Sequence, residues 1–174
     1  MIIKAIISEY KRYKSLADLA IEQVGKKEFH QVFGDDGNSI AVIVKHLAGN
    51  LKSRFTNFLT EDGEKPWRNR DNEFEDENET SNELLVRWNE TFEILFKQLN
   101  SLTDNDLNKI VKIRGSELTV ADALERSLAH TSYHVGQIVL IAKWYTGKQW
   151  KSLSIPRGGS KEYNKNPTKE KKPK

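Results

Sequence analysis

Cysteine is absent from the 174 residues of this chain, and no hydrophobic run in it is long enough to cross a bilayer. Without cysteine the protein can form no disulfide and offer no thiolate ligand, so any metal ion must bind to His, Asp or Glu. Thiol chemistry would need a thiol from outside the chain. Lys4 and Glu9 interrupt the N-terminal segment before it could form the apolar core of a signal peptide. We therefore expect a soluble, cytoplasmic protein with no membrane partner.

Excess positive charge is confined to one end of the chain. The net charge is +3, but residues 161–174 carry six Lys against two Glu, so the rest of the chain sums to −1. A nucleic-acid partner is therefore not expected. A segment of Lys, Asn and Pro cannot bury apolar area, which predicts a disordered Lys-rich tail over residues 161–174 after a single domain over residues 1–160.

Apolar residues recur at three- and four-residue intervals in four segments, which is the pattern of amphipathic helices. These segments cover about residues 3–24, 40–59, 80–99 and 119–145. Ser39 is a suitable N-cap for the second helix. Thr80 and Glu83 have the spacing of a capping box at the start of the third, and Gly147 should end the fourth. Four long helices with one apolar stripe each predict an all-α four-helix bundle.

The connections between these helices carry loop and turn signals. Gly63 and Pro66 exclude a continued helix in the long polar loop after the second helix, residues 61–79, which we call the excursion; such loops are often functional. Between the third and fourth helices, the alternation around Arg114 and Gly115 predicts a small β-hairpin, with an irregular loop as the alternative. We expect this second connection to tilt the chain away from simple up-and-down order.

Three histidines occupy comparable positions on two of the predicted helices. His130 and His134 are four residues apart, so their side chains lie one turn above each other on the same face. His46 lies beside the apolar stripe of the second helix. If these two helices pack side by side, three neutral imidazoles would form an open metal site. Because an isolated HxxxH is a weak motif, polar or surface histidines are the alternative. His30 matches no ligand spacing.

Three segments carry a resemblance to a known family. They are NSIAVIVKHLAGNLKSRFTNFLTEDGEKPWRNRD, LAHTSYHVGQIVLIAKW and SLSIPRG, in this order. They resemble the DinB/YfiT-like metal-binding four-helix bundles, in particular a branch of domains of unknown function, over most of residues 1–160. The resemblance implies that His46, His130 and His134 bind one divalent ion, with zinc and nickel as the expected metals. Members of known activity use such an ion to help a low-molecular-weight thiol attack an electrophile, or in some cases to hydrolyse a bond.

The function expected from this resemblance is that of a metal-dependent transferase. The ion would activate a small-molecule thiol, brought from outside the chain, towards an electrophilic substrate. A metal-dependent hydrolase and a non-catalytic metal-binding or sensor module are the alternatives, and the sequence does not separate them. It also leaves the oligomeric state open, a homodimer included.

Arginine and polar residues near the predicted site are candidates for binding the substrate. Arg side chains bind carboxylates bidentately, so those in the excursion and in SIPRG could hold an acidic group. The expected substrate-binding residues are Asn50, Trp67, Arg68, Arg70 and Arg157. Solvated loop charges or loop-anchoring salt bridges are the alternative for the arginines. Asn50 could also support a metal ligand. Tyr133 and Gln137 are weaker candidates, because they lie roughly 60 to 100° round the helix from the two histidines.

Overall fold

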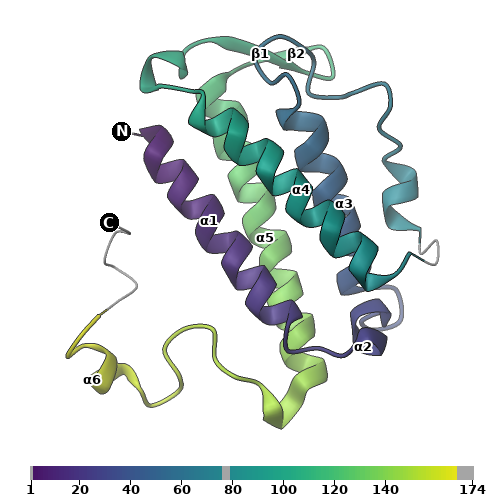
Figure 1. Cartoon of the computed structure of the whole chain (residues 1–174), viewed down its shortest axis with the longest axis vertical. Helices are drawn as coiled ribbons and strands as arrows, with labels where there is room; N and C mark the ends of the chain where they lie inside the picture. Colours follow the sequence, from purple (N-terminus) through teal and green to yellow (C-terminus); the bar gives the residue numbers. More distant parts are fainter. Residues whose placement is uncertain (1, 76–78, 168–174) are drawn as a thin grey trace.

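The computed structural model describes residues 2–75 and 79–167, and four long helices packed together dominate it (Figure 1). They are α1 (Ile2–Ile21), α3 (Ile40–Phe55), α4 (Ser81–Asn100) and α5 (Val120–Thr146). The shorter elements are the helices α2 (Lys26–His30) and α6 (Ser160–Tyr163) and the 3-10 turns η1 (Asp71–Phe74), η2 (Asp104–Asp106) and η3 (Gly147–Gln149). The predicted four-helix bundle is confirmed.

Side-chain caps start the helices where the sequence indicates. Ser39 accepts a hydrogen bond from the backbone of the first turn of α3. Thr80 and Thr119 each form a capping box, at the start of α4 and of α5. Gly147 follows α5 with a φ of 56°, in the left-handed region that glycine adopts without strain. These local signals therefore place three of the four long helices to within a residue or two at the capped end.

The predicted end of the second helix is wrong by four residues. α3 ends at Phe55, because Thr56 is extended and Asn57 has a φ of 50°, a conformation that Asn tolerates better than most residues. Phe58 is nevertheless buried and its ring lies 5.2 Å from that of Phe55. Phe58 therefore has the burial of a helical stripe position although the chain has already turned. α1 likewise ends at Ile21, earlier than predicted, in a turn.

The four long helices run in pairs of the same direction. α1 and α5 run one way, and α3 and α4 run the other way (Figure 1). α1 packs on α5, α4 on α3, and α3 on α5. Residues 56–75 run back along the bundle before α4 begins, so the connectivity is not simple up-and-down. The sequence predicted that the connection after α4 would break the up-and-down order. The connection between α3 and α4 breaks it instead.

The predicted β-hairpin is also confirmed. Strands β1 (Ile110–Ile113) and β2 (Ser116–Thr119) pair antiparallel across a turn in which Gly115 has a φ of 75°. The hairpin lies across one end of the bundle (Figure 1). Asp62 of the excursion accepts hydrogen bonds from the backbone nitrogens of Arg114, at 2.8 Å, and Gly115, at 2.7 Å. The hairpin and the excursion are therefore held together.

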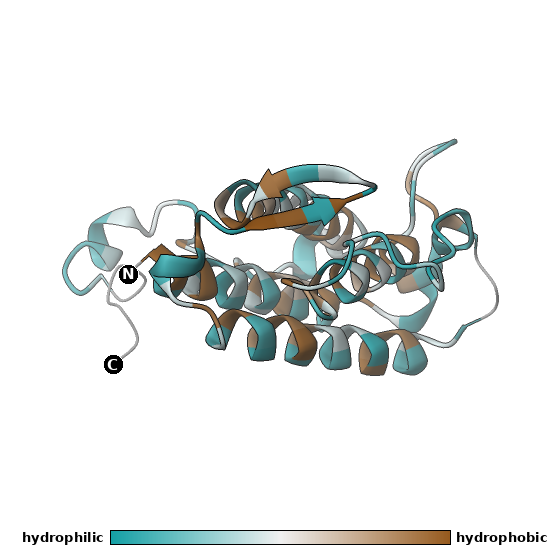
Figure 2. Cartoon of the chain, turned by 90° about the horizontal axis from the view of Figure 1, so that it is seen from above, coloured by the Kyte–Doolittle hydropathy of each residue, from teal (hydrophilic) through white to brown (hydrophobic). Residues whose placement is uncertain are grey.

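Large apolar side chains from all four long helices fill the core. Those with the lowest exposure include Tyr10, Leu47, Leu51, Phe55, Trp88, Phe92, Leu95, Leu124 and Ile138. Hydrophobic and hydrophilic residues alternate along the helices, as expected for amphipathic segments (Figure 2). Within the described chain, no helix is both long and apolar enough to cross a membrane.

The predicted tail is only partly covered by the structure, since residues 168–174 lie outside the described residues. Its described start forms the exposed helix α6, whereas Trp150 and Leu153 further upstream pack against the core. We expect deletion of residues 161–174 to change the melting temperature by less than about 2 °C, because exposed segments contribute little to stability. Deletion from residue 148 removes the two packed side chains and should lower it clearly. Thermal unfolding followed by circular dichroism compares the two, and equal losses would show that the tail docks.

Candidate metal centre

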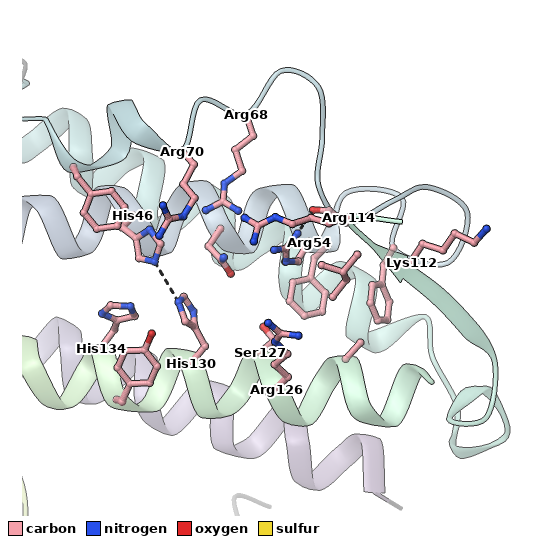
Figure 3. Close-up of a pocket in the computed structure, with 18 residues that line it drawn as sticks. His46, Arg54, Arg68, Arg70, Lys112, Arg114, Arg126, Ser127, His130 and His134 are labelled. Carbon is pink, nitrogen blue, oxygen red and sulfur yellow. Dashed lines mark hydrogen bonds between the residues drawn. The ribbon is translucent and has the colours of Figure 1, made fainter. Parts of the chain in front are cut away.

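Three histidines from two helices meet at the seam between α3 and α5. His46 projects from α3, and His130 and His134 project from successive turns of α5 (Figure 3). One ring nitrogen of each lies within 4.8 Å of the others, and Nε2 of His46 is 3.2 Å from Nε2 of His130. Two imidazoles on a tetrahedral zinc ion place their nitrogens about 3.3 Å apart when each bond is near 2.0 Å. The three side chains are therefore placed where they could hold one divalent ion.

A buried carboxylate orients His46. Nδ1 of His46 lies 2.9 Å from Oε2 of Glu73, which can only accept, so Nδ1 carries the proton and Nε2 keeps its lone pair. Arg68 donates to both oxygens of the same carboxylate, each at 2.8 Å. Burial by itself would raise the pKa of Glu73, but the hydrogen bonds from Arg68 and His46 lower the pKa below its ordinary value. Glu73 thus stays ionised and points Nε2 of His46 at the other two histidines.

Gln137 orients the ring of His134, as Glu73 orients that of His46. Its Oε1 lies 2.7 Å from Nδ1 of His134, and an amide oxygen accepts, so Nε2 of His134 is again the free nitrogen. The structure thus gives Gln137, a weaker candidate by helical angle, a direct contact with the site. Tyr133, the other weaker candidate, packs its ring edge-on to His130, with centroids 5.2 Å apart.

Burial keeps the two histidines of α5 neutral. Burial, followed by repulsion from His134 and His46, lowers the pKa of His130 to about 4. Burial also lowers the pKa of His134 to about 4, although its hydrogen bond to Gln137 acts in the opposite direction. The neutral imidazole is the form that binds a metal ion, so both side chains are ready to do so at neutral pH.

These lowered pKa values predict a loss of stability in acid for the metal-free protein. In the unfolded chain His130 and His134 bind protons near pH 6.5, whereas in the folded chain they do so only near pH 4. Between these limits the unfolded state holds more protons, so the free energy of unfolding should fall as the pH falls, by at most about 1.4 kcal/mol per pH unit for each histidine. Urea unfolding of chelator-treated protein at pH 6.5, 5.5 and 4.5 measures the slope. His134→Asn, which cannot titrate, should show a shallower slope, and an unchanged slope would contradict the assignment.

The histidines lie at one end of a cavity of about 280 Å³. Its walls come from α3, α5, the excursion and the hairpin (Figure 3). Among the predicted substrate-binding residues, Asn50, Arg68 and Arg70 line this cavity. Trp67 does not line it; this residue is 53% exposed, and the amine of Lys52 lies 5.8 Å from the centre of its ring. The fifth candidate, Arg157, lies in the exposed segment after α5 and is not among the described residues that line the cavity.

The excursion is tied down over the site by buried polar contacts. Ser53 of α3 donates to the carbonyl of Gly63 at 2.6 Å and accepts from the backbone of Lys65. Phe74 stacks on the ring of His46 with centroids 4.8 Å apart. Arg68, whose side chain is 1% exposed, belongs to this framework through its pair with Glu73. The loop-anchoring alternative therefore holds for Arg68.

The sequence reasoning missed several residues of the site, and four of them show why. Arg126 and Ser127 lie one turn before His130, and Arg54 lies two turns after His46. The rule that grouped the histidines by helical face would have found these three. Glu73 offers no such signal, because it is one of several acidic residues in an irregular loop.

Comparison with known proteins identifies a family. The model of DUF1572, described as a protein of unknown function, matches residues 1–159. The chain belongs to the DUF1572 family. No curated protein and no solved structure matches it. The DUF1572 match spans the whole bundle and the three histidines but assigns no chemistry, and the wider resemblance to the DinB/YfiT-like bundles stays a prediction. Function must therefore be argued from the site.

Proposed function

We propose that this DUF1572 protein is a divalent-metal-dependent enzyme that activates a low-molecular-weight thiol for attack on an electrophile. The observation that carries the proposal is the convergence of three imidazoles at the end of an open cavity. Structural zinc ions are normally closed in by four protein ligands, whereas catalytic ones keep a position for water or substrate. No fourth His, Asp or Glu joins the group within the described chain. The arrangement therefore favours a catalytic ion over a structural one.

The chain's own residues prepare the site for this chemistry. When bound, the ion would supply Lewis acidity that lowers the pKa of a thiol or water at its free position. Glu73 and Gln137 hold the rings of His46 and His134 so that their Nε2 lone pairs converge. Zinc and nickel are the proposed metals, since imidazole ligands suit both.

The positive charge of the cavity supports a thiol, in particular, as the molecule that binds at the open coordination position of the ion. Arg54, Arg68 and Arg126 line the same cavity as the histidines, and positive charge in the cavity stabilises a thiolate relative to its thiol. The chain has no cysteine, so the sulfur must come from a separate molecule. The resemblance to the DinB/YfiT-like bundles points the same way.

Metal analysis and thiol binding test this function whatever the electrophile is. Untagged protein should contain close to one zinc or nickel ion per chain. After exchange for cobalt, a small thiol such as 2-mercaptoethanol should add a sulfur-to-cobalt charge-transfer band to the spectrum. The band should be absent in His134→Ala and present in His30→Ala, whose histidine lies outside the triad. A cobalt spectrum that no thiol alters would contradict the transferase function.

Turnover can then be followed with an aryl chloride as the electrophile. The ring carries nitro groups that activate it, so the thiolate sulfur first adds to the ring carbon, the carbon–chlorine bond then breaks, chloride leaves, and the thiol proton goes to solvent. We expect the metal-loaded protein to exceed the uncatalysed rate at least about tenfold, which corresponds to only about 1.4 kcal/mol of barrier. Hydrolysis of an activated ester without any thiol would instead support the hydrolase alternative.

A further inference from the structure

We propose that the cavity binds a small molecule with two functional ends, one reaching the three histidines and the other an oxyanion, a carboxylate or phosphate, held by the arginines beyond them. The inference deepens the proposed function and rests on it for the reactive end only. The oxyanion end depends on residues that the metal does not touch.

Positive charge dominates the lining of the cavity. Six cationic side chains contribute to it, and none of the described lining residues is acidic. The six are Arg54, Arg68, Arg70, Lys112, Arg114 and Arg126. They come from α3, the excursion, the hairpin and α5, and most of the guanidinium groups are directed towards one space beside the histidines (Figure 3). Lys112 sits at the rim, 3.7 Å from Glu117, and has no part in the proposal.

Neighbouring carboxylates neutralise only part of this charge. A single oxygen of Glu64 is shared by Arg114 at 3.1 Å, Arg54 at 3.2 Å and Arg68 at 3.6 Å. Glu73 neutralises only Arg68 among the six. The crowding is also evident at Arg54, where burial first, and then repulsion from Arg68 and Arg114 against the attraction of Glu64, lowers the pKa of the guanidinium. An anion in the cavity would relieve this repulsion.

Loop anchoring explains only part of the cluster. It accounts for Arg54, which donates to the carbonyl of Gly63 at 2.6 Å, and for the pair of Arg68 with Glu73. It does not account for Arg126, an exposed side chain of α5 that lines the cavity and makes no hydrogen bond or ion pair to a described residue.

A buried guanidinium nitrogen of Arg68 in the cavity wall has no hydrogen-bond partner among the described residues. Nη1 of Arg68 makes no hydrogen bond to the described residues, and Oε2 of Glu64 is too far away at 3.6 Å. The side chain is 1% exposed, so water does not readily compensate. Leaving such a charged donor unsatisfied is unfavourable, and an oxyanion would accept from it and from Arg126 together.

The spacing of residues along α3 and α5 indicates how long the proposed ligand should be. Arg54 is eight residues from His46 along α3, and Arg126 is four residues from His130 along α5. At 1.5 Å per residue these separations are about 12 and 6 Å. Ser127, between the two ends on α5, is small enough to leave room. A molecule whose metal-binding atom and oxyanion lie about 6 to 12 Å apart therefore fits.

Mercaptocarboxylates of increasing chain length test both ends at once. Binding is followed by the spectrum of the cobalt-substituted protein, with a mercaptoalcohol of equal length as the neutral probe. We expect an acid of matching span to bind at least about tenfold more tightly than its alcohol, the gain of one charge-assisted contact. Arg126→Gln should remove most of this preference, so that the ratio of acid to alcohol affinity falls towards one. Arg12→Gln, at an exposed arginine paired with Glu9 on α1, should behave as wild type.

Two outcomes would overturn the proposal. One is equal affinity of acid and alcohol at every length, and the other is a preference that survives the combined change Arg54→Gln with Arg126→Gln. Exchange of the carboxylate for a phosphonate identifies the better oxyanion, and either result supports the proposal. If no thiol alters the cobalt spectrum but succinate or inorganic phosphate still binds in an Arg126-dependent way, the oxyanion site stands and the thiol function fails.

Discussion

Saturating zinc or nickel should raise the free energy of unfolding of the wild-type protein by about 2.7 kcal/mol at a hundredfold excess over Kd, and His134→Ala should abolish this rise. The ion can bind only the folded bundle, because its ligands come from two helices that are separate in the unfolded chain. His134 supplies one of the three clustered nitrogens, so its loss leaves two ligands. Urea unfolding of untagged protein, with chelator and with excess metal, measures both quantities.

His30→Ala provides the matched control for this experiment. His30 lies on α2 with its ring against Phe29 and outside the histidine group. Its loss should leave the metal-dependent rise intact. An equal rise in the wild type and in His134→Ala would remove the evidence for the triad and leave a helical bundle with a cationic cavity.

Gly49→Ala should weaken metal binding about 10- to 100-fold although it replaces a glycine inside a helix. Such a change ordinarily stabilises a protein, because Gly in a helix is about 0.5–1 kcal/mol less favourable than Ala. Here the new Cβ would lie 2.2 Å from Oε1 and 2.7 Å from Cδ of Glu73. Glu73 would have to move, and its contacts with His46 and Arg68 would be lost. Calorimetric titration with zinc gives the affinity, and urea unfolding gives the stability.

Gly136→Ala is the control that separates the gain in helix stability expected of Gly49→Ala from its effect on metal binding. Gly136 lies within α5, and a Cβ there would meet no atom within 4 Å. It should gain the ordinary stabilisation and keep its metal affinity. Glu73→Gln should weaken the affinity in the same direction as Gly49→Ala, because it removes the charge that holds the Nδ1 proton of His46. Unchanged zinc affinity in both Gly49→Ala and Glu73→Gln would show that Glu73 does not support the site.

What the amino-acid sequence determines by itself is local. The caps at Ser39, Thr80 and Thr119 and the apolar stripes depend on residues three or four positions apart, and the structure reproduces them. The same short-range geometry places His130 and His134 on one face of a helix. The stop of α3 at Phe55 was not predictable in this way, because the stripe continues to Phe58 while the backbone turns at Asn57.

What only the tertiary structure decides is which segments meet. Glu73 reaches His46 across 27 residues, and Gly49 matters only because that carboxylate packs against it. Trp67 and Arg68 are neighbours in the chain, yet one faces outward and the other is buried at the site. The path of the excursion depends on many separate contacts with α3 and the hairpin, each of them modest and none encoded by a periodic pattern. Helix periodicity therefore places His130 and His134 on one face, and the family resemblance adds His46 to them. The meeting of α3 with α5, the buried carboxylate behind His46 and the arginines in the cavity follow from long-range packing.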